Sequence, residues 1–71
     1  MKYRIREYRE RLGWSQNELS RRSGVPQSAI SRYEAGEQEP GYSRLKRIAK
    51  ALGVSVEELE ITQEEQHQTT A

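Results

Sequence analysis

The 71-residue chain contains no cysteine, which excludes disulfide frameworks, thiolate zinc sites and thiol nucleophiles and fits a reducing, cytoplasmic setting. Aspartate is also absent, and the single histidine, His67, lies in a polar segment without partner ligands. We therefore expect no metal, no cofactor and no enzyme active site. No stretch approaches the roughly 20 apolar residues of a membrane span, and the basic N-terminus is not followed by the apolar segment of a signal peptide.

Charge is distributed unevenly along the chain, although the formal net charge is only +1. All 12 lysines and arginines lie within residues 1–50 together with six glutamates, which gives this part a net charge of +6. Residues 51–71 carry five glutamates and no basic residue. A basic body favours a polyanionic partner. A highly charged solvated surface would give the same composition, so charge alone does not decide.

Glycines divide the chain into short segments, each with helical periodicity. The four glycines that follow such segments suit the left-handed position after a helix: Gly13, Gly24, Gly36 and Gly53. We expect helices at about residues 2–12, 26–35 and 42–52, and two more that begin after Ser15 and Ser55. Alternating strand patterns are absent, so the predicted fold is all-α with five helices. The polar, acidic residues 62–71 are predicted to form a disordered tail.

Two of the predicted helices share one start pattern. Ser15 and Ser55 are each followed three residues later by a glutamate, Glu18 and Glu58, which is the spacing of a capping box. Each serine also lies between apolar residues at the spacing of a hydrophobic staple. Both serines are therefore predicted to cap a helix.

A tight turn at Gly24-Val25 joins two short helices, as in a helix-turn-helix unit. An ordinary helical hairpin has the same turn, so the turn alone does not identify the unit and the second helix has to decide. At 100° per residue its apolar side chains share one arc, and the opposite arc contains Gln27, Ser28, Ser31, Arg32 and Ala35. Arginine and glutamine are the side chains that form paired hydrogen bonds with guanine and adenine in the major groove.

Two opposite charges occupy positions that should face the core. Arg9 lies between apolar positions of the first helix, and Glu34 lies beside Ile30 on the apolar arc of the third. Because a buried charge is costly unless it is paired, we expect one structural ion pair between Arg9 and Glu34.

The sequence resembles the lambda-repressor-like, or xenobiotic-response-element (Cro-type), helix-turn-helix family over about residues 5–59. The matching motifs are Ser15-Gln16-x-x-Leu19, Gly24-Val25, Ile30-Ser31-x-Tyr33-Glu34-x-Gly36-x-x-x-Pro40, Leu45 and Ile48-Ala49-x-Ala51-Leu52-Gly53-Val54. The resemblance implies a five-helix DNA-binding domain over residues 1–61, acting as a transcriptional repressor or activator. It also implies that Gln27, Ser28, Ser31 and Arg32 face bases and that Gln16 contacts a phosphate, and it includes the Arg9–Glu34 bridge.

Two departures from the family pattern affect binding. Pro26 stands where a serine or threonine usually caps the third helix, and the loop that often carries basic residues contains Glu37 and Glu39. These acidic side chains would repel phosphates, which leaves backbone N–H groups, Arg44 and Lys46 as the expected phosphate contacts there. We therefore expect a monomer to bind DNA weakly.

The apolar residues near residue 60 bear on whether the protein assembles into a dimer. Val56, Leu59 and Ile61 exceed what a small core needs, and the family commonly dimerises near its last two helices, so we expect a homodimer that reads an inverted repeat in double-stranded DNA. The alternative is that these side chains only complete the monomer core. A protein-interaction module of the same fold, such as an antitoxin or a regulator's protein partner, is the second functional hypothesis.

Overall fold

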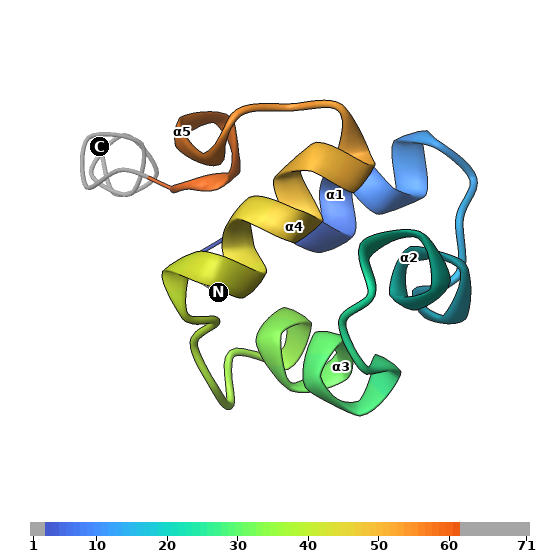
Figure 1. Cartoon of the computed structure of the whole chain (residues 1–71), viewed down its shortest axis with the longest axis horizontal. Coiled ribbons are helices and arrows are strands. Elements are labelled where there is room, and N and C mark those ends of the chain that lie inside the picture. The colour runs from blue at the N-terminus through green and yellow to red at the C-terminus, as the bar shows by residue number, and fades with distance from the viewer. Residues whose placement is uncertain (1–2, 62–71) are drawn as a thin grey trace, which may run out of the picture.

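The computed structural model describes residues 3–61, and the predicted tail lies outside this range. The described chain forms five helices: α1 (Ile5–Arg11), α2 (Gln16–Ser23), α3 (Gln27–Ala35), α4 (Tyr42–Leu52) and α5 (Val56–Leu59). Figure 1 shows α4 crossing the middle of the molecule. It packs against α1, α2 and α5, and α3 packs against α1 and α2. The structure confirms the all-α, five-helix prediction.

Every helix contributes to one small core. Its largest fully buried side chains come from all five helices and from the turn between α2 and α3: Ile5, Leu19, Val25, Ile30, Ile48 and Leu59. Burying each of them contributes roughly 1.5–3 kcal/mol. In α4 the residues Leu45, Ile48, Ala49 and Leu52, spaced at i, i+3, i+4 and i+7, form one buried stripe.

The first helix begins later than predicted, at Ile5 rather than at about Lys2. Tyr3 instead forms an isolated antiparallel β-bridge with Glu60, and the amide of Arg4 donates a hydrogen bond to the carbonyl of Leu59 over 2.7 Å. These backbone bonds tie the segment before α1 to the end of α5. The sequence gives no local sign of this pairing because the partners are far apart along the chain.

The two serine caps differ. Both serine hydroxyls accept a hydrogen bond from the backbone amide three residues later. At Ser55 the capping box is complete, because the Glu58 carboxylate also accepts from the Ser55 amide over 2.9 Å. At Ser15 only half of the predicted box forms. The Glu18 carboxylate binds Arg21 and Arg22 instead, and these arginines have no counterpart after Glu58.

Candidate nucleic-acid interface

The turn between α2 and α3 fixes the relative orientation of these helices. Gly24 ends α2 with a φ of 76°, a left-handed conformation that strains any residue with a side chain. Val25 is buried, and its amide donates to the Ser23 hydroxyl. Pro26 lies at the N-cap of α3, where its carbonyl accepts from the amides of Ala29 and Ile30. The turn therefore starts α3 at Gln27 without a side-chain cap.

The α3 helix has one buried and one exposed face. The buried face consists of Ala29, Ile30, Tyr33 and Glu34. The exposed polar side chains are the four predicted to read bases: Gln27, Ser28, Ser31 and Arg32. Within residues 3–61, no hydrogen bond or ion pair engages these four side chains, so their polar ends remain able to bind a ligand. Their base contacts stay a prediction.

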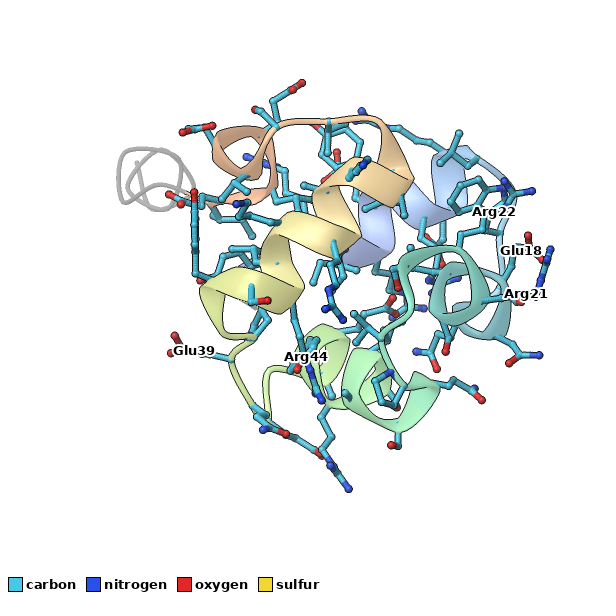
Figure 2. The ribbon with its side chains drawn as sticks, viewed as in Figure 1. Glu18, Arg21, Arg22, Glu39 and Arg44 are labelled. Atoms are coloured by element: carbon cyan, nitrogen blue, oxygen red, sulfur yellow. The ribbon has the colours of Figure 1, made fainter. Side chains whose placement is uncertain are left out.

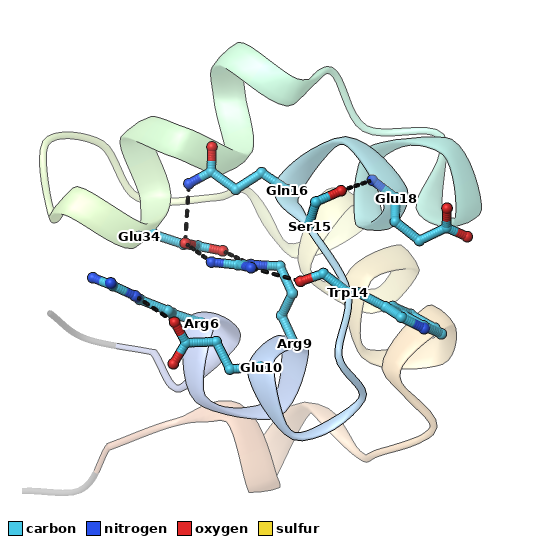
Figure 3. A network of polar contacts seen from close by, with 8 residues as sticks. All are labelled: Arg6, Arg9, Glu10, Trp14, Ser15, Gln16, Glu18 and Glu34. Carbon is cyan, nitrogen blue, oxygen red and sulfur yellow. Dashed lines mark hydrogen bonds and ion pairs between the residues drawn. The ribbon is translucent and has the colours of Figure 1, made fainter.

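Arg9 and Glu34 form a buried, two-pronged ion pair that joins α1 to α3 (Figure 3). Nε of Arg9 donates to Oε2 of Glu34 over 2.8 Å, and Nη2 donates to Oε1 over 2.9 Å. Nη1 of Arg9 donates to the Trp14 carbonyl over 2.7 Å. The hydrogen bonds from Arg9 to Glu34 raise the pKa of Arg9 and outweigh the opposing effect of burial. The pair is fully hydrogen-bonded, as a buried ion pair must be to be tolerated.

Gln16, the predicted phosphate contact, begins α2 and is half-buried. Its Nε2 donates a hydrogen bond to Oε1 of Glu34 over 3.1 Å, which links the start of α2 to the buried face of α3. Sequence reasoning missed this link. The core-facing position of Glu34 and the family position of Gln16 were the only available signals, and they did not connect the two residues. The phosphate contact stays a prediction.

The two basic residues predicted to hold phosphates lie on different sides of α4. Arg44 points toward α3 (Figure 2), and its Nη1 donates to the Tyr33 hydroxyl over 3.1 Å. The ammonium of Lys46 lies 5.4 Å from the ring centre of Tyr42 and lines a recess between α4 and α5. Arg44 is therefore in contact with α3 through Tyr33. Lys46 is directed elsewhere, and its phosphate contact stays a prediction without support from this geometry.

The three predicted dimer residues also differ in position. Leu59 is fully buried, so its side chain has no surface left for a partner, as the monomer-core alternative requires. Val56 and Ile61 are half-buried. Val56 lines the recess between α4 and α5 with Ala49, Val54 and the 69% exposed Tyr42, which the sequence did not single out. We name this feature the α4–α5 recess.

No cluster of three or more histidine, cysteine, aspartate or glutamate residues within residues 3–61 could hold a metal ion. No helix in the same range is long and apolar enough to cross a membrane.

Residues 5–59 match the protein-family model described as Helix-turn-helix. The chain belongs to the helix-turn-helix family. It is of the XRE/Cro type, whose members are DNA-binding transcriptional regulators and not enzymes. The match confirms the resemblance found in the sequence.

Two relatives are uncharacterised helix-turn-helix-type transcriptional regulators. A protein of Sinorhizobium fredii is 46% identical over 52 residues, which are 73% of this chain and 26% of the relative. One from Methanothermobacter thermautotrophicus is 43% identical over 53 residues, covering 75% of this chain and 77% of the relative. The chain thus spans about a quarter of the first relative and most of the second.

Two solved structures of SinR have the same fold. SinR, described as the master regulator for biofilm formation, in complex with DNA, has a TM-score of 0.73 at 36% identity. That match covers 76% of this chain and 87% of the SinR chain. The structure of a SinR–SinI complex has a TM-score of 0.78 at 36% identity and covers 93% of this chain and 62% of the other.

Proposed function

We propose that the protein is a sequence-specific transcriptional regulator that inserts α3 into the major groove of double-stranded DNA. One observation carries the proposal: four adjacent polar side chains on the exposed face of α3 have no partner within residues 3–61, while the opposite face is buried. Gln27, Ser28, Ser31 and Arg32 are the proposed base contacts. Arg32 has the fork that suits O6 and N7 of guanine, and Gln27 is suited to adenine. The DNA complex of the related SinR supports this function.

Gln16 and Arg44 are the proposed backbone contacts. Gln16 lines a recess together with Ser31 of the exposed face of α3, and Arg44, itself exposed, points toward α3 and bonds to the Tyr33 hydroxyl. In helix-turn-helix proteins the first helix of the motif crosses the DNA backbone, which is the position that α2 and Gln16 would take. The exposed loop residues Glu37 and Glu39 would face phosphates unfavourably. A single domain should therefore bind weakly.

We further propose that two copies form a two-fold dimer on an inverted repeat, with half-site centres about 10 base pairs, or about 34 Å, apart. The α4–α5 recess supports this arrangement, because its apolar lining includes the exposed Tyr42 and the half-buried Val56. Lysines flank it on α4, and α5 carries exposed glutamates, so that a two-fold axis could bring opposite charges together. Sedimentation velocity should show a dimer at high protein concentration. A monomer there, together with footprints of one half-site, would contradict the dimer.

In vitro selection of bound DNA tests the central proposal. We expect enrichment of one sequence containing an inverted repeat, and weaker binding of that sequence by the Arg32→Ala variant. Absence of any enriched sequence would contradict sequence-specific binding. Because a regulator of this kind works where the chromosome is, we expect the protein in the cytoplasm.

A protein-interaction module is the second candidate function. The SinR–SinI complex favours it, since that similar protein is seen with a protein partner. A gel shift against genomic fragments separates the candidates: retarded fragments support DNA binding, whereas no retardation by a folded protein supports the interaction module.

A further inference from the structure

Two side chains from separate helices, Arg9 of α1 and Gln16 of α2, meet at the carboxylate of Glu34. Glu34 accepts two hydrogen bonds from Arg9 and a third from Nε2 of Gln16 (Figure 3). An arginine side chain can only donate, and an ionised carboxylate can only accept. The direction of every bond is therefore fixed by chemistry. The amide of Gln16 must turn its nitrogen, not its oxygen, toward Glu34.

This hydrogen bond leaves part of the Gln16 amide available. The nitrogen carries two hydrogens, of which one is donated to Glu34. The second hydrogen can still donate to an acceptor outside the protein, such as a phosphate oxygen. A glutamine side chain is flexible, and ordering it during binding would cost entropy. Glu34 removes part of this cost because it holds the amide before the ligand arrives.

The held amide lies beside the exposed face of α3. A polar recess of about 270 Å³ is lined by Gln16 and Glu34 together with Ser31 and Ala35 of α3, and with Arg6 and Arg9 of α1. Ser31 is one of the proposed base contacts. A DNA duplex that receives α3 in its major groove would bring its backbone to the start of α2, where Gln16 lies. The negative charge of Glu34 would not repel that backbone strongly, because Arg9 neutralises it.

We propose that Glu34 is a positioning residue for DNA binding, which orients the Gln16 amide toward a phosphate of the DNA backbone. The buried Arg9–Glu34 pair then has a second role beyond stability, since its loss also releases Gln16. The inference rests on the proposed DNA-binding function.

A variant that removes the carboxylate without leaving a buried charge provides the test. Replacing a buried ion pair by packed apolar side chains often preserves the fold, so the double variant Arg9→Met, Glu34→Leu is suitable. Gln16→Ala is then compared in the wild-type and double-variant backgrounds by measuring DNA affinity. In the wild-type background we expect a loss of roughly 3- to 10-fold per half-site, the size of one hydrogen bond. In the double-variant background we expect a loss of less than about twofold, because the amide is no longer held.

Gln38→Ala is the matched control, since Gln38 is an exposed glutamine in the loop after α3. Its effect on affinity should be the same in both backgrounds. An equal loss from Gln16→Ala in both backgrounds would overturn the proposal and leave the ion pair with a structural role only.

A measurement on the free protein separates failure of this inference from failure of the proposed function. In the NMR spectrum of the wild type, the side-chain amide hydrogens of Gln16 should exchange with solvent more slowly than those of Gln38. Equal exchange would overturn the positioning of Gln16, whether or not DNA binds. Slow exchange without any DNA binding would overturn the proposed function, and with it the DNA-binding role of Glu34. The measurement needs no variant that must fold.

Discussion

The two faces of α3 differ in whether their polar side chains have hydrogen-bond partners within the protein. On the buried face, Glu34 accepts three hydrogen bonds and the Tyr33 hydroxyl accepts one from Arg44. No buried side-chain nitrogen or oxygen in residues 3–61 lacks a partner. On the exposed face, the polar side chains have no partner in that part of the chain. The difference indicates that one face fixes the helix and the other is available to a ligand. Substitutions on the first should change stability, and substitutions on the second should change DNA binding.

The largest expected effect is on the buried face. Arg9→Ala would leave Glu34 buried without its charged partner, which should reduce the free energy of unfolding by about 3–5 kcal/mol. The double variant Arg9→Met, Glu34→Leu should recover much of this loss. Thermal and chemical denaturation measure both. If Arg9→Ala melts within a degree or two of the wild type, the pair is exposed to solvent and not buried.

A smaller effect is expected where the two faces meet. Arg44 is exposed and bonds to Tyr33, so Arg44→Ala should change stability little and weaken binding to all DNA sequences about equally. If Arg44 contacts one phosphate, the slope of log affinity against log salt concentration should fall by ~1 per half-site. Titrations at several salt concentrations measure the slope. A changed order of preference among DNA sequences would instead assign Arg44 to base reading.

The smallest effect is expected at an exposed ion-pair cluster on α2. Hydrogen bonds from Arg21 and Arg22 lower the pKa of Glu18 below its ordinary value of 4.5. Because the pKa of Glu18 is lower in the folded state than in the unfolded state, its ion pairs stabilise the protein at a pH above the ordinary pKa. This stabilisation is lost as the pH falls through the lowered pKa of the folded state. Glu18→Gln should therefore melt slightly below the wild type at neutral pH, and the difference should disappear in acid.

Exposed ion pairs contribute little, so the change should be far smaller than that of Arg9→Ala. Glu37→Gln, in the exposed loop after α3, is the control for removing one negative charge. A melting difference between wild type and Glu18→Gln that persists unchanged in acid would contradict the role of the ion pairs.

The parts of the fold that could be predicted are those that depend on residues close together in the sequence. The bounds of α4 follow from its apolar stripe and from Gly53, and the exposed and buried faces of α3 follow from helical periodicity. Where a residue had more than one possible hydrogen-bond partner, the sequence did not predict which partner it binds. Glu18 had the spacing for a capping box but bonds to two arginines, and Tyr3 pairs with the end of α5 instead of extending α1.

In the candidate site, too, features set within one helix could be predicted and contacts between helices could not. Its residue types and their exposure on α3 could be read from the sequence, because they depend on one helix. The bond from Gln16 to Glu34 and the full burial of Leu59 could not, because they depend on how separate helices pack. The first adds a contact within the protein to the predicted phosphate-binding residue Gln16, and the second leaves Leu59 without surface for a partner.

The most direct test of base reading by α3 compares Arg32→Ala with the wild type on a panel of single-base variants of the selected DNA site. Arg11→Ala, which removes an exposed arginine from α1, is the control for lost positive charge. If Arg32 reads a guanine, its loss should cost about 1–3 kcal/mol per half-site and relax the preference at one base pair. The melting temperature should not change. If the rank order of the panel stays intact, Arg32 only anchors the DNA backbone, and the assignment of base reading to this side chain is wrong.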